Sequence, residues 1–242
     1  MHRVFLSVLA LFVFQASTED LPSFIHVCQK SDPNLIQCLM AAVEDVRPFF
    51  VDGVPEYNIP KLEPLIMKDF FSEEAAGMKI TVSDVSAWGC SDYLVRSMEV
   101  DMDNHHFIVN IEIPKLRIEA HYNVDGKLVV MPIKGDGHIE INITDVTARS
   151  ELMGVQFEKD GQNHLRFDKF DIEVKVGGGM ARVENLFNGD KVLLGMVNDV
   201  VNKNFDMFLR ELLPIIQRQL GVVFKEAANA IVERFAYEQL FP

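Results

Sequence analysis

The feature that most constrains the fold is a long succession of strand-like segments followed by one long helical pattern. From about residue 80 to residue 187, apolar side chains alternate with polar ones, most regularly at Ile139, Ile141 and Ile143. Successive side chains of a strand point to opposite faces, so each segment predicts a ribbon with one apolar and one polar face. Five turn signals predict antiparallel hairpins between the segments: Asp103-Asn104, Asp125-Gly126, Gly135-Asp136-Gly137, Asp160-Gly161 and Gly177-Gly178-Gly179.

The helical pattern covers residues 191–235, where apolar residues recur mainly three or four positions apart along one face. These residues are Leu194, Val197, Val201, Phe205, Phe208, Leu212, Ile216, Val223, Ala227 and Ile231. Pro214 and Gly221 are expected to bend this helix. Long strands must twist and coil strongly, and a coiled sheet encloses what lies on its concave side. The sequence therefore predicts an α+β fold, in which a strongly curved antiparallel sheet wraps the apolar face of a long C-terminal helix.

A shorter helix is predicted near the N-terminus, over residues 34–50. The stretch Ser31-Asp32-Pro33 is a typical helix start, and Pro48 should end or kink the helix. Residues 51–71 contain three further prolines and many apolar groups. We expect this stretch to be an extended connector that lies against the surface of the domain.

The first residues indicate the cellular compartment. Arg3 precedes an apolar run at residues 4–14, and small residues follow at positions 16–18. This layout is typical of a secretory signal and is too short to span a bilayer. We therefore expect residues 1–18 to be a signal peptide and residues 19–242 to form a single secreted, extracellular domain. The rest of the sequence has no apolar stretch of transmembrane length, so stable membrane insertion is not expected.

The charge of the chain excludes one class of partner. The formal net charge is −13, and it becomes −14 once Arg3 is removed with the signal peptide. Nucleic acid and anionic membrane surfaces repel a protein of this charge, and its lysines are scattered rather than clustered. Nucleic acid is therefore excluded as a partner.

The three cysteines suggest one disulfide. Cys28 and Cys38 lie ten residues apart, and in a secreted chain we expect them to pair. A loop of this size gives about 2–3 kcal/mol of stabilisation. Cys90 is left over and is expected to be a buried thiol that behaves as a small apolar group. The spacing of the three residues fits no metal site.

No motif in the sequence indicates catalysis. The seven histidines form no HExxH motif, and no Gly-x-Ser-x-Gly elbow is present. Asp101 to His106 lacks the glycine of a calcium loop, and the glycine-rich stretches open no helix that would hold a phosphate. We therefore expect no enzymatic activity, no metal and no cofactor. Asn142-Ile143-Thr144 is a glycosylation sequon, and Asn142 lies on the polar face of its predicted strand.

Two motifs accompany the Cys28–Cys38 pair: Tyr122-x-x-x-Gly126-Lys-Leu-x-x-x-Pro132-Ile-x-Gly135-x-Gly137 and Tyr237-Glu238-Gln239-Leu240-Phe241-Pro242. With these motifs, the order of the pieces resembles the insect juvenile-hormone-binding protein and takeout family over essentially the whole mature chain. In this family the hormone-binding branch has a second disulfide in the sheet region, where this sequence has only Cys90, so the resemblance favours the takeout-like branch.

The resemblance implies a single lipid-binding module of the tubular type, a super-roll with an elongated apolar cavity between sheet and helix. It implies a carrier that sequesters a small hydrophobic ligand, a juvenile-hormone-like terpenoid or a fatty acyl lipid. Whether a receptor or a membrane takes the loaded form is left open. The expected cavity walls are the apolar faces of the two helices and the sheet: Leu39, Val43, Val46, Phe50, Trp88, Phe107, Val109, Ile111, Tyr122, Ile139, Ile141, Val197, Val201, Phe205, Phe208 and Leu212.

Two of these residues are the expected polar anchors for the ligand. Tyr122 and Trp88 each combine a large apolar body with one hydrogen-bond donor. Thr81, Ser83 and Asn110 are weaker candidates. An alternative of a different class is an interaction or lipid-surface module that shares the fold but has a filled interior. An internal tunnel would indicate the carrier, whereas side chains packed to ordinary density would indicate the module.

Overall fold

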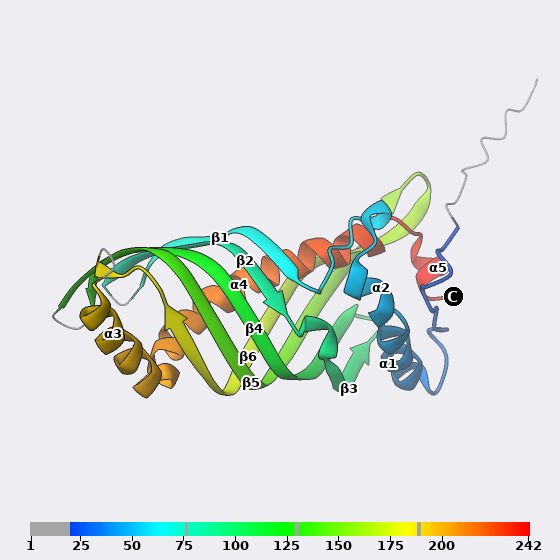
Figure 1. Ribbon diagram of the computed structural model, residues 1–242. Helices are drawn as coiled ribbons and strands as arrows, with labels where there is room; N and C mark the ends of the chain where they lie inside the picture. The colour runs from blue at the N-terminus through cyan, green and yellow to red at the C-terminus, as the bar shows by residue number, and fades with distance from the viewer. Residues whose placement is uncertain (1–19, 76, 129–130, 188–189) are drawn as a thin grey trace, which may run out of the picture.

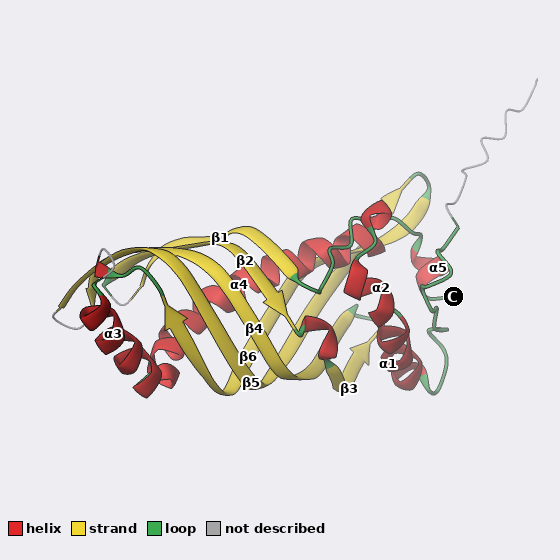
Figure 2. Ribbon diagram, viewed as in Figure 1, coloured by secondary structure: helices red, strands yellow, loops and turns green. Residues whose placement is uncertain are grey.

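The computed structural model describes residues 20–75, 77–128, 131–187 and 190–242. It shows an elongated molecule in which a strongly curled antiparallel sheet wraps around one long helix (Figures 1 and 2). The predicted α+β fold is thereby confirmed. The predicted signal peptide, residues 1–18, lies outside the described residues.

The sheet has the strand order β1-β2-β4-β5-β6, with β3 paired to β4 beside this path. All neighbouring strands are antiparallel. The strands are β1 (Leu65–Ala75), β2 (Met78–Trp88), β3 (Leu94–Asp101), β4 (His106–Leu128), β5 (Met131–Lys159) and β6 (Gln162–Val183). With 23, 29 and 22 residues, β4, β5 and β6 are far longer than ordinary strands, so the twist that accumulates along them curls the sheet.

Three of the five predicted turns are wrong. Asp103-Asn104 and Asp160-Gly161 do connect β3 to β4 and β5 to β6. The other three glycine-containing stretches lie within β4, β5 and β6. Gly179 serves close packing rather than a turn. A Cβ atom at this position would lie 2.8 Å from the ring of Phe205 and 2.7 Å from Ile143. This glycine lets the long helix approach the sheet closely.

The predicted connector over residues 51–71 is also partly wrong, because its last residues form the edge strand β1. Phe70 and Phe71 are adjacent and both buried, which breaks the alternation that marks a strand. The pairing of β1 with β2 has a register shift between Asp69 and Phe71. Such a bulge places successive side chains on the same face and hides the strand from a pattern of period two.

The C-terminal helical region consists of two helices rather than one bent helix. They are α3 (Lys191–Lys203) and α4 (Phe205–Val232), and the break is at Asn204 (φ −123°, ψ 28°). The side-chain amide of Asn204 donates to the carbonyl of Val200, an alternative to helical backbone bonding that asparagine often takes. Pro214 lies inside α4 without ending it. At Gly221 a Cβ atom would lie 2.6 Å from the carbonyl oxygen of Phe170, so this glycine also serves close approach.

The predicted N-terminal helix is likewise split, into α1 (Leu35–Asp45) and α2 (Arg47–Asp52), with Pro48 in the first turn of α2. Two short 3-10 helices, η1 (Pro55–Tyr57) and η2 (Cys90–Asp92), and the C-terminal helix α5 (Tyr237–Leu240) complete the chain. Helices α1, α2 and α5 lie at one end of the roll, and α3 lies at the opposite end (Figure 1).

The edge strand β6 is joined to the helices by a row of side-chain amides, which we call the amide ladder. Each amide oxygen accepts the backbone N–H of one β6 residue at 2.7–2.9 Å. In three of the four side chains the amide NH2 group also donates to the carbonyl oxygen of that residue. The helices thus take the place of a further strand, which protects the free edge of the sheet. The pairs are Asn198 with Val183, Asn202 with Ala181, Gln217 with Val174, and Asn229 with Phe167.

The other edge of the sheet, β1, meets α4 mainly through apolar contacts. Phe70 and Phe71 form a buried cluster with Ile215 of α4. An ion pair between Arg218 and Glu73 crosses this seam. Helix α4 therefore lies between the two edges of the curled sheet and closes the roll along its length.

Candidate functional site: the interior of the roll

Among the described residues, the interior is lined by apolar side chains that form three separate buried clusters along the roll. The first lies at the α3 end and includes Tyr122 and Val197. The second surrounds Phe70, Phe71 and Ile215, and the third joins Phe107 to Tyr237 near α5. Between the clusters the inner face carries both buried side chains, such as Ile143 and Val146, and half-buried ones.

Several inward-facing side chains in the middle of the roll are only half-buried. Ile141 lies between Ile118 and the buried Ala181 in the sheet register, so it points inward, yet it keeps accessible surface. Val109 is paired with the buried Met98 and is also only half-buried. The same is true of five further residues from the expected walls: Ile111, Ile139, Phe205, Phe208 and Leu212. A fully packed core would leave little of this apolar surface accessible.

Helix α4 presents its apolar stripe to this region. The ring of Phe205 lies against the backbone at Gly179 on β6. Phe208 and Leu212 follow at helical spacing on the same face, which continues to the buried Ile215. Helix α4 and strands β4 to β6 therefore turn apolar side chains towards each other.

The expected wall residues from the first helix lie away from this middle region. Leu39 and Val43 are on α1, Val46 joins α1 to α2, and Phe50 is on α2. All four are half-buried at the end of the roll that α1 and α2 cover. The hydroxyl of Tyr93 donates to the carbonyl of Val43 at 2.8 Å and helps to hold α1 there. The expected wall thus spans the roll from α1 to Val197 and Val201 at the opposite end.

The structure contradicts the expectation that Trp88 faces the interior. After a register shift between Ser83 and Ser86, the inward, buried side chains of β2 are Val85 and Ala87, so Trp88 lies on the outer face. The guanidinium of Arg117 lies 5.3 Å from the centre of its ring there. The register shift reverses the alternation that Ile80 and Val82 begin, and the indole packs under a surface arginine instead.

Tyr122 does point inward, but its hydroxyl is already bonded. It donates to the carbonyl oxygen of Glu184 at 2.5 Å, and the ring is buried in the first cluster. Burial raises the pKa of Tyr122 to about 12. The hydroxyl therefore ties β4 to the chain after β6 and is not free to anchor a ligand, contrary to expectation.

The weaker polar candidates also have partners within the sheet. The hydroxyls of Thr81 and Ser72 are 2.7 Å apart across β1 and β2. The amide of Asn110 donates to the hydroxyl of Ser97 at 3.0 Å, and both residues are on the exposed side of their strands. The hydroxyl of Ser83 donates to Asp84 at 3.3 Å. The polar candidates from the sequence therefore give the interior no hydrogen-bonding anchor.

Sequence reasoning missed several inward-facing residues in the middle of the sheet. Ile118 and Ala120 face the second cluster, in the same strand as the inward Val109 and Ile111. The parity changes because Pro114 and Lys115 are both exposed. Apolar residues alternate regularly on each side of Pro114. A prediction that treated the two sides as separate segments would have placed Ile118 and Ala120 on the inner face.

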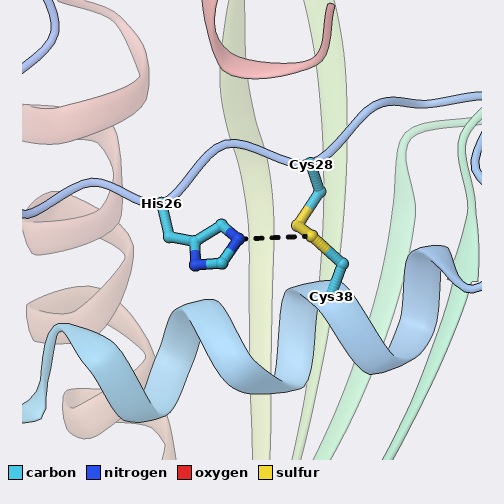
Figure 3. Close-up of side chains that lie close together, drawn as sticks. All are labelled: His26, Cys28 and Cys38. Atoms are coloured by element: carbon cyan, nitrogen blue, oxygen red, sulfur yellow. Dashed lines mark hydrogen bonds between the residues drawn. A yellow bond between two sulfur atoms is a disulfide. The ribbon is translucent and has the colours of Figure 1, made fainter.

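The expected disulfide between Cys28 and Cys38 is present and joins the N-terminal segment to α1. His26 lies beside it (Figure 3), with Nε2 3.7 Å from Sγ of Cys38 and Nδ1 2.8 Å from a carboxylate oxygen of Asp45. Within the described residues, His26, Cys28 and Cys38 are the one group of side chains with the spacing of metal ligands. Because the two sulfurs are bonded to each other, they are not thiolate ligands.

Cys90 is the free cysteine, and its thiol lies mostly out of solvent, near the carbonyl of Ala87. Burial and the nearby carboxylate of Glu63 raise the pKa of Cys90 to about 12. The thiol is therefore almost fully protonated at neutral pH, as expected for a small apolar group rather than a nucleophile. The sequon residue Asn142 is exposed on the outer face of β5.

The rolled sheet closed by a helix is a takeout-like fold. A family model described as haemolymph juvenile hormone binding protein matches residues 7–242. The chain therefore belongs to the haemolymph juvenile hormone binding protein family. In the described part of the chain, no helix combines the length and apolar character needed to cross a membrane.

Two related proteins and one solved structure align with nearly the whole chain. The circadian clock-controlled protein daywake of Drosophila melanogaster is 25% identical over 236 residues, which cover 93% of this chain and 90% of that protein. A putative beta-carotene-binding protein of Schistocerca gregaria is 21% identical over 220 residues, which cover 90% and 88% of the two chains. The solved structure of takeout 1 of Epiphyas postvittana has a TM-score of 0.78 at 19% identity and covers 90% of this chain and 99% of that chain. This last likeness shows the fold.

Proposed function

We propose that the chain is a secreted carrier that holds a small hydrophobic molecule, a terpenoid or a fatty acyl lipid, in the middle of the roll. The observation that carries this proposal is the accessible surface on inward-facing apolar residues such as Val109, Ile141 and Phe208. Side chains packed as in an ordinary core would bury this surface. A bound apolar molecule would bury it instead, at about 25 cal/mol for each Å² removed from water.

The nature of the walls defines the class of ligand. The polar candidates Tyr122, Thr81 and Asn110 are all bonded within the protein, so the ligand is held through apolar contacts. Apolar walls discriminate weakly, since one methylene changes affinity by about 1–3 kcal/mol. The proposed carrier therefore accepts several related molecules. The name of the locust relative, a putative beta-carotene-binding protein, supports an apolar ligand.

The proposed location is extracellular, and the proposed role is binding rather than catalysis. The Cys28–Cys38 disulfide supports an oxidising compartment, in which such bonds persist. The predicted signal peptide at residues 1–18 supports the same location. Among the expected wall residues that face the interior, all but Tyr122 are apolar, and the Tyr122 hydroxyl is bonded to the carbonyl of Glu184, so they offer no free nucleophile or general base.

Native mass spectrometry of the protein secreted from insect cells tests the proposal, followed by organic extraction of whatever it carries. The proposal expects a co-purifying mass of a few hundred daltons, one molecule per chain, which extraction identifies as a terpenoid or a fatty acid. An empty protein that also takes up neither juvenile hormone nor fatty acids would contradict the carrier. That result would favour the interaction module with a filled interior.

A further inference from the structure

The side chain of Asn142, on the outer face of the sheet, is suited to covalent modification. Asn142 begins the sequon Asn142-Ile143-Thr144, is exposed, and lies in the middle of β5. In the sheet register its neighbours are Arg117 on β4 and Met180 on β6. Its amide makes one long hydrogen bond, in which Nδ2 lies 3.5 Å from a carboxylate oxygen of Glu140. The amide nitrogen is therefore accessible from solvent.

A shallow groove begins at Asn142 and crosses β6 towards α3. Its volume is about 280 Å³. The side chain of Met180 lies in this groove and is 62% exposed, which is unusual for so apolar a group. The groove also contains both signs of charge, from Glu140 and Arg182, and the amides of Asn198 and Asn202 at its far side.

We propose that Asn142 carries an N-linked glycan and that its first N-acetylglucosamine lies in this groove, over Met180. One face of this sugar consists of C–H groups, which pack on a soft thioether side chain. Its hydroxyl and acetamido groups point to the rim, where Glu140 and Arg182 are suitable partners. The glycan thus shields the exposed methionine and covers the seam between β6 and α3.

The bond that forms joins Nδ2 of Asn142 to the anomeric carbon of the sugar. The bond that breaks joins this carbon to the diphosphate of a lipid-linked oligosaccharide donor, and the amide nitrogen loses one proton. The remaining N–H of the amide can keep its hydrogen bond to Glu140. Transfer before the strands pair removes the obstacle of a mid-strand position. This inference rests on entry into the secretory pathway, as in the proposed function, and on no property of the interior.

The test is secretion of the full chain from insect cells, once with its own leader and once with an unrelated signal sequence. Intact mass and peptide mapping then show whether Asn142 is modified. Thr144→Ala removes the sequon, and Thr144→Ser keeps it as the matched control. We expect a glycan on the parent protein and on the Thr144→Ser variant, and none on Thr144→Ala. An unmodified Asn142 on protein exported with the unrelated signal overturns the site, whereas failure of export with the natural leader alone contradicts only the proposed secretion.

Oxidation by dilute hydrogen peroxide tests where the sugar lies. Met196 on α3 is 59% exposed and lies outside the groove, so it is the internal reference for Met180. In the glycosylated protein we expect Met180 to form sulfoxide several-fold more slowly than Met196. In Thr144→Ala the two rates become similar. Equal rates in the glycosylated protein would show that the glycan extends into solvent and would overturn the proposed seating.

Discussion

Replacing Asn229 with alanine tests how α4 is held to the edge of the sheet. The side-chain amide of Asn229 accepts the N–H of Phe167 at 2.8 Å and donates to the carbonyl of the same residue at 2.9 Å. The variant loses both bonds and leaves two backbone groups of a mostly buried residue without their partners. Each bond contributes about 0.5–1.5 kcal/mol, so the two together contribute about 1–3 kcal/mol. Alanine forms helix better than asparagine by roughly 0.6 kcal/mol. We therefore expect the free energy of unfolding to fall by about 0.5–2.5 kcal/mol.

Urea denaturation followed by circular dichroism measures this change as a lower midpoint with an unchanged slope. Glu226→Ala is the matched control, because Glu226 is exposed on the same helix and its replacement should change stability by about 0.5 kcal/mol or less. Hydrogen exchange adds a local measurement, in which the Phe167 amide should exchange faster in the Asn229→Ala variant. If Asn229→Ala is as stable as the control and the Phe167 amide stays protected, the amide ladder does not hold the helix to the sheet.

Three further predictions follow from the interior and the cysteines. Phe205→Asp places a charge on the inner stripe of α4 and should abolish uptake of a fatty acid probe. Met207→Asp, at an exposed position on the same helix, should leave uptake intact. A folded Phe205→Asp variant with normal affinity would show that α4 does not line the binding site. Replacing Cys28 and Cys38 with serine should lower the free energy of unfolding by about 2–3 kcal/mol in urea denaturation, and unchanged stability would contradict a structural role for the disulfide. Because the pKa of Cys90 is raised to about 12, iodoacetamide at pH 8 should modify this thiol only after unfolding, and rapid alkylation of the folded protein would contradict this prediction. The contribution of the buried thiol to stability is present below the ordinary pKa of 9.0 and is lost as the pH rises towards 12.

The curled sheet and much of its inner face were predictable from the sequence. Alternation is a local property, so Ile139, Ile141 and Ile143 indicate their face without knowledge of their partners. The same pattern failed wherever the backbone departs from strict alternation. The bulge at Phe70 and Phe71 interrupts the alternation of β1, so the pattern does not predict this strand. At the exposed pair Pro114 and Lys115, the residues of β4 that face inward change from odd to even positions.

Other features depend on contacts between distant residues, which a local pattern does not contain. Gly179 was expected in a turn, but it lies within a strand because Phe205 packs against it. Asn202 and Asn229 read as ordinary polar positions on a helix, and only the placement of the helix beside β6 gives them their partners. The predicted orientation of Trp88 was wrong because the pairing of β2 with β4 shifts register between Ser83 and Ser86, which reverses the two faces of β2 before Trp88.

The measurement that tests the central claim most directly is photo-crosslinking of a bound ligand. A fatty acid with a diazirine on its chain is loaded into the secreted protein and irradiated, and the modified peptides are mapped by mass spectrometry. If the ligand lies in the middle of the roll, crosslinks should fall on inward residues such as Ile111, Ile141 and Phe208. Crosslinks confined to the exposed outer face of α3, at Val192 and Met196, would instead show a ligand bound at the surface and would contradict the proposed carrier.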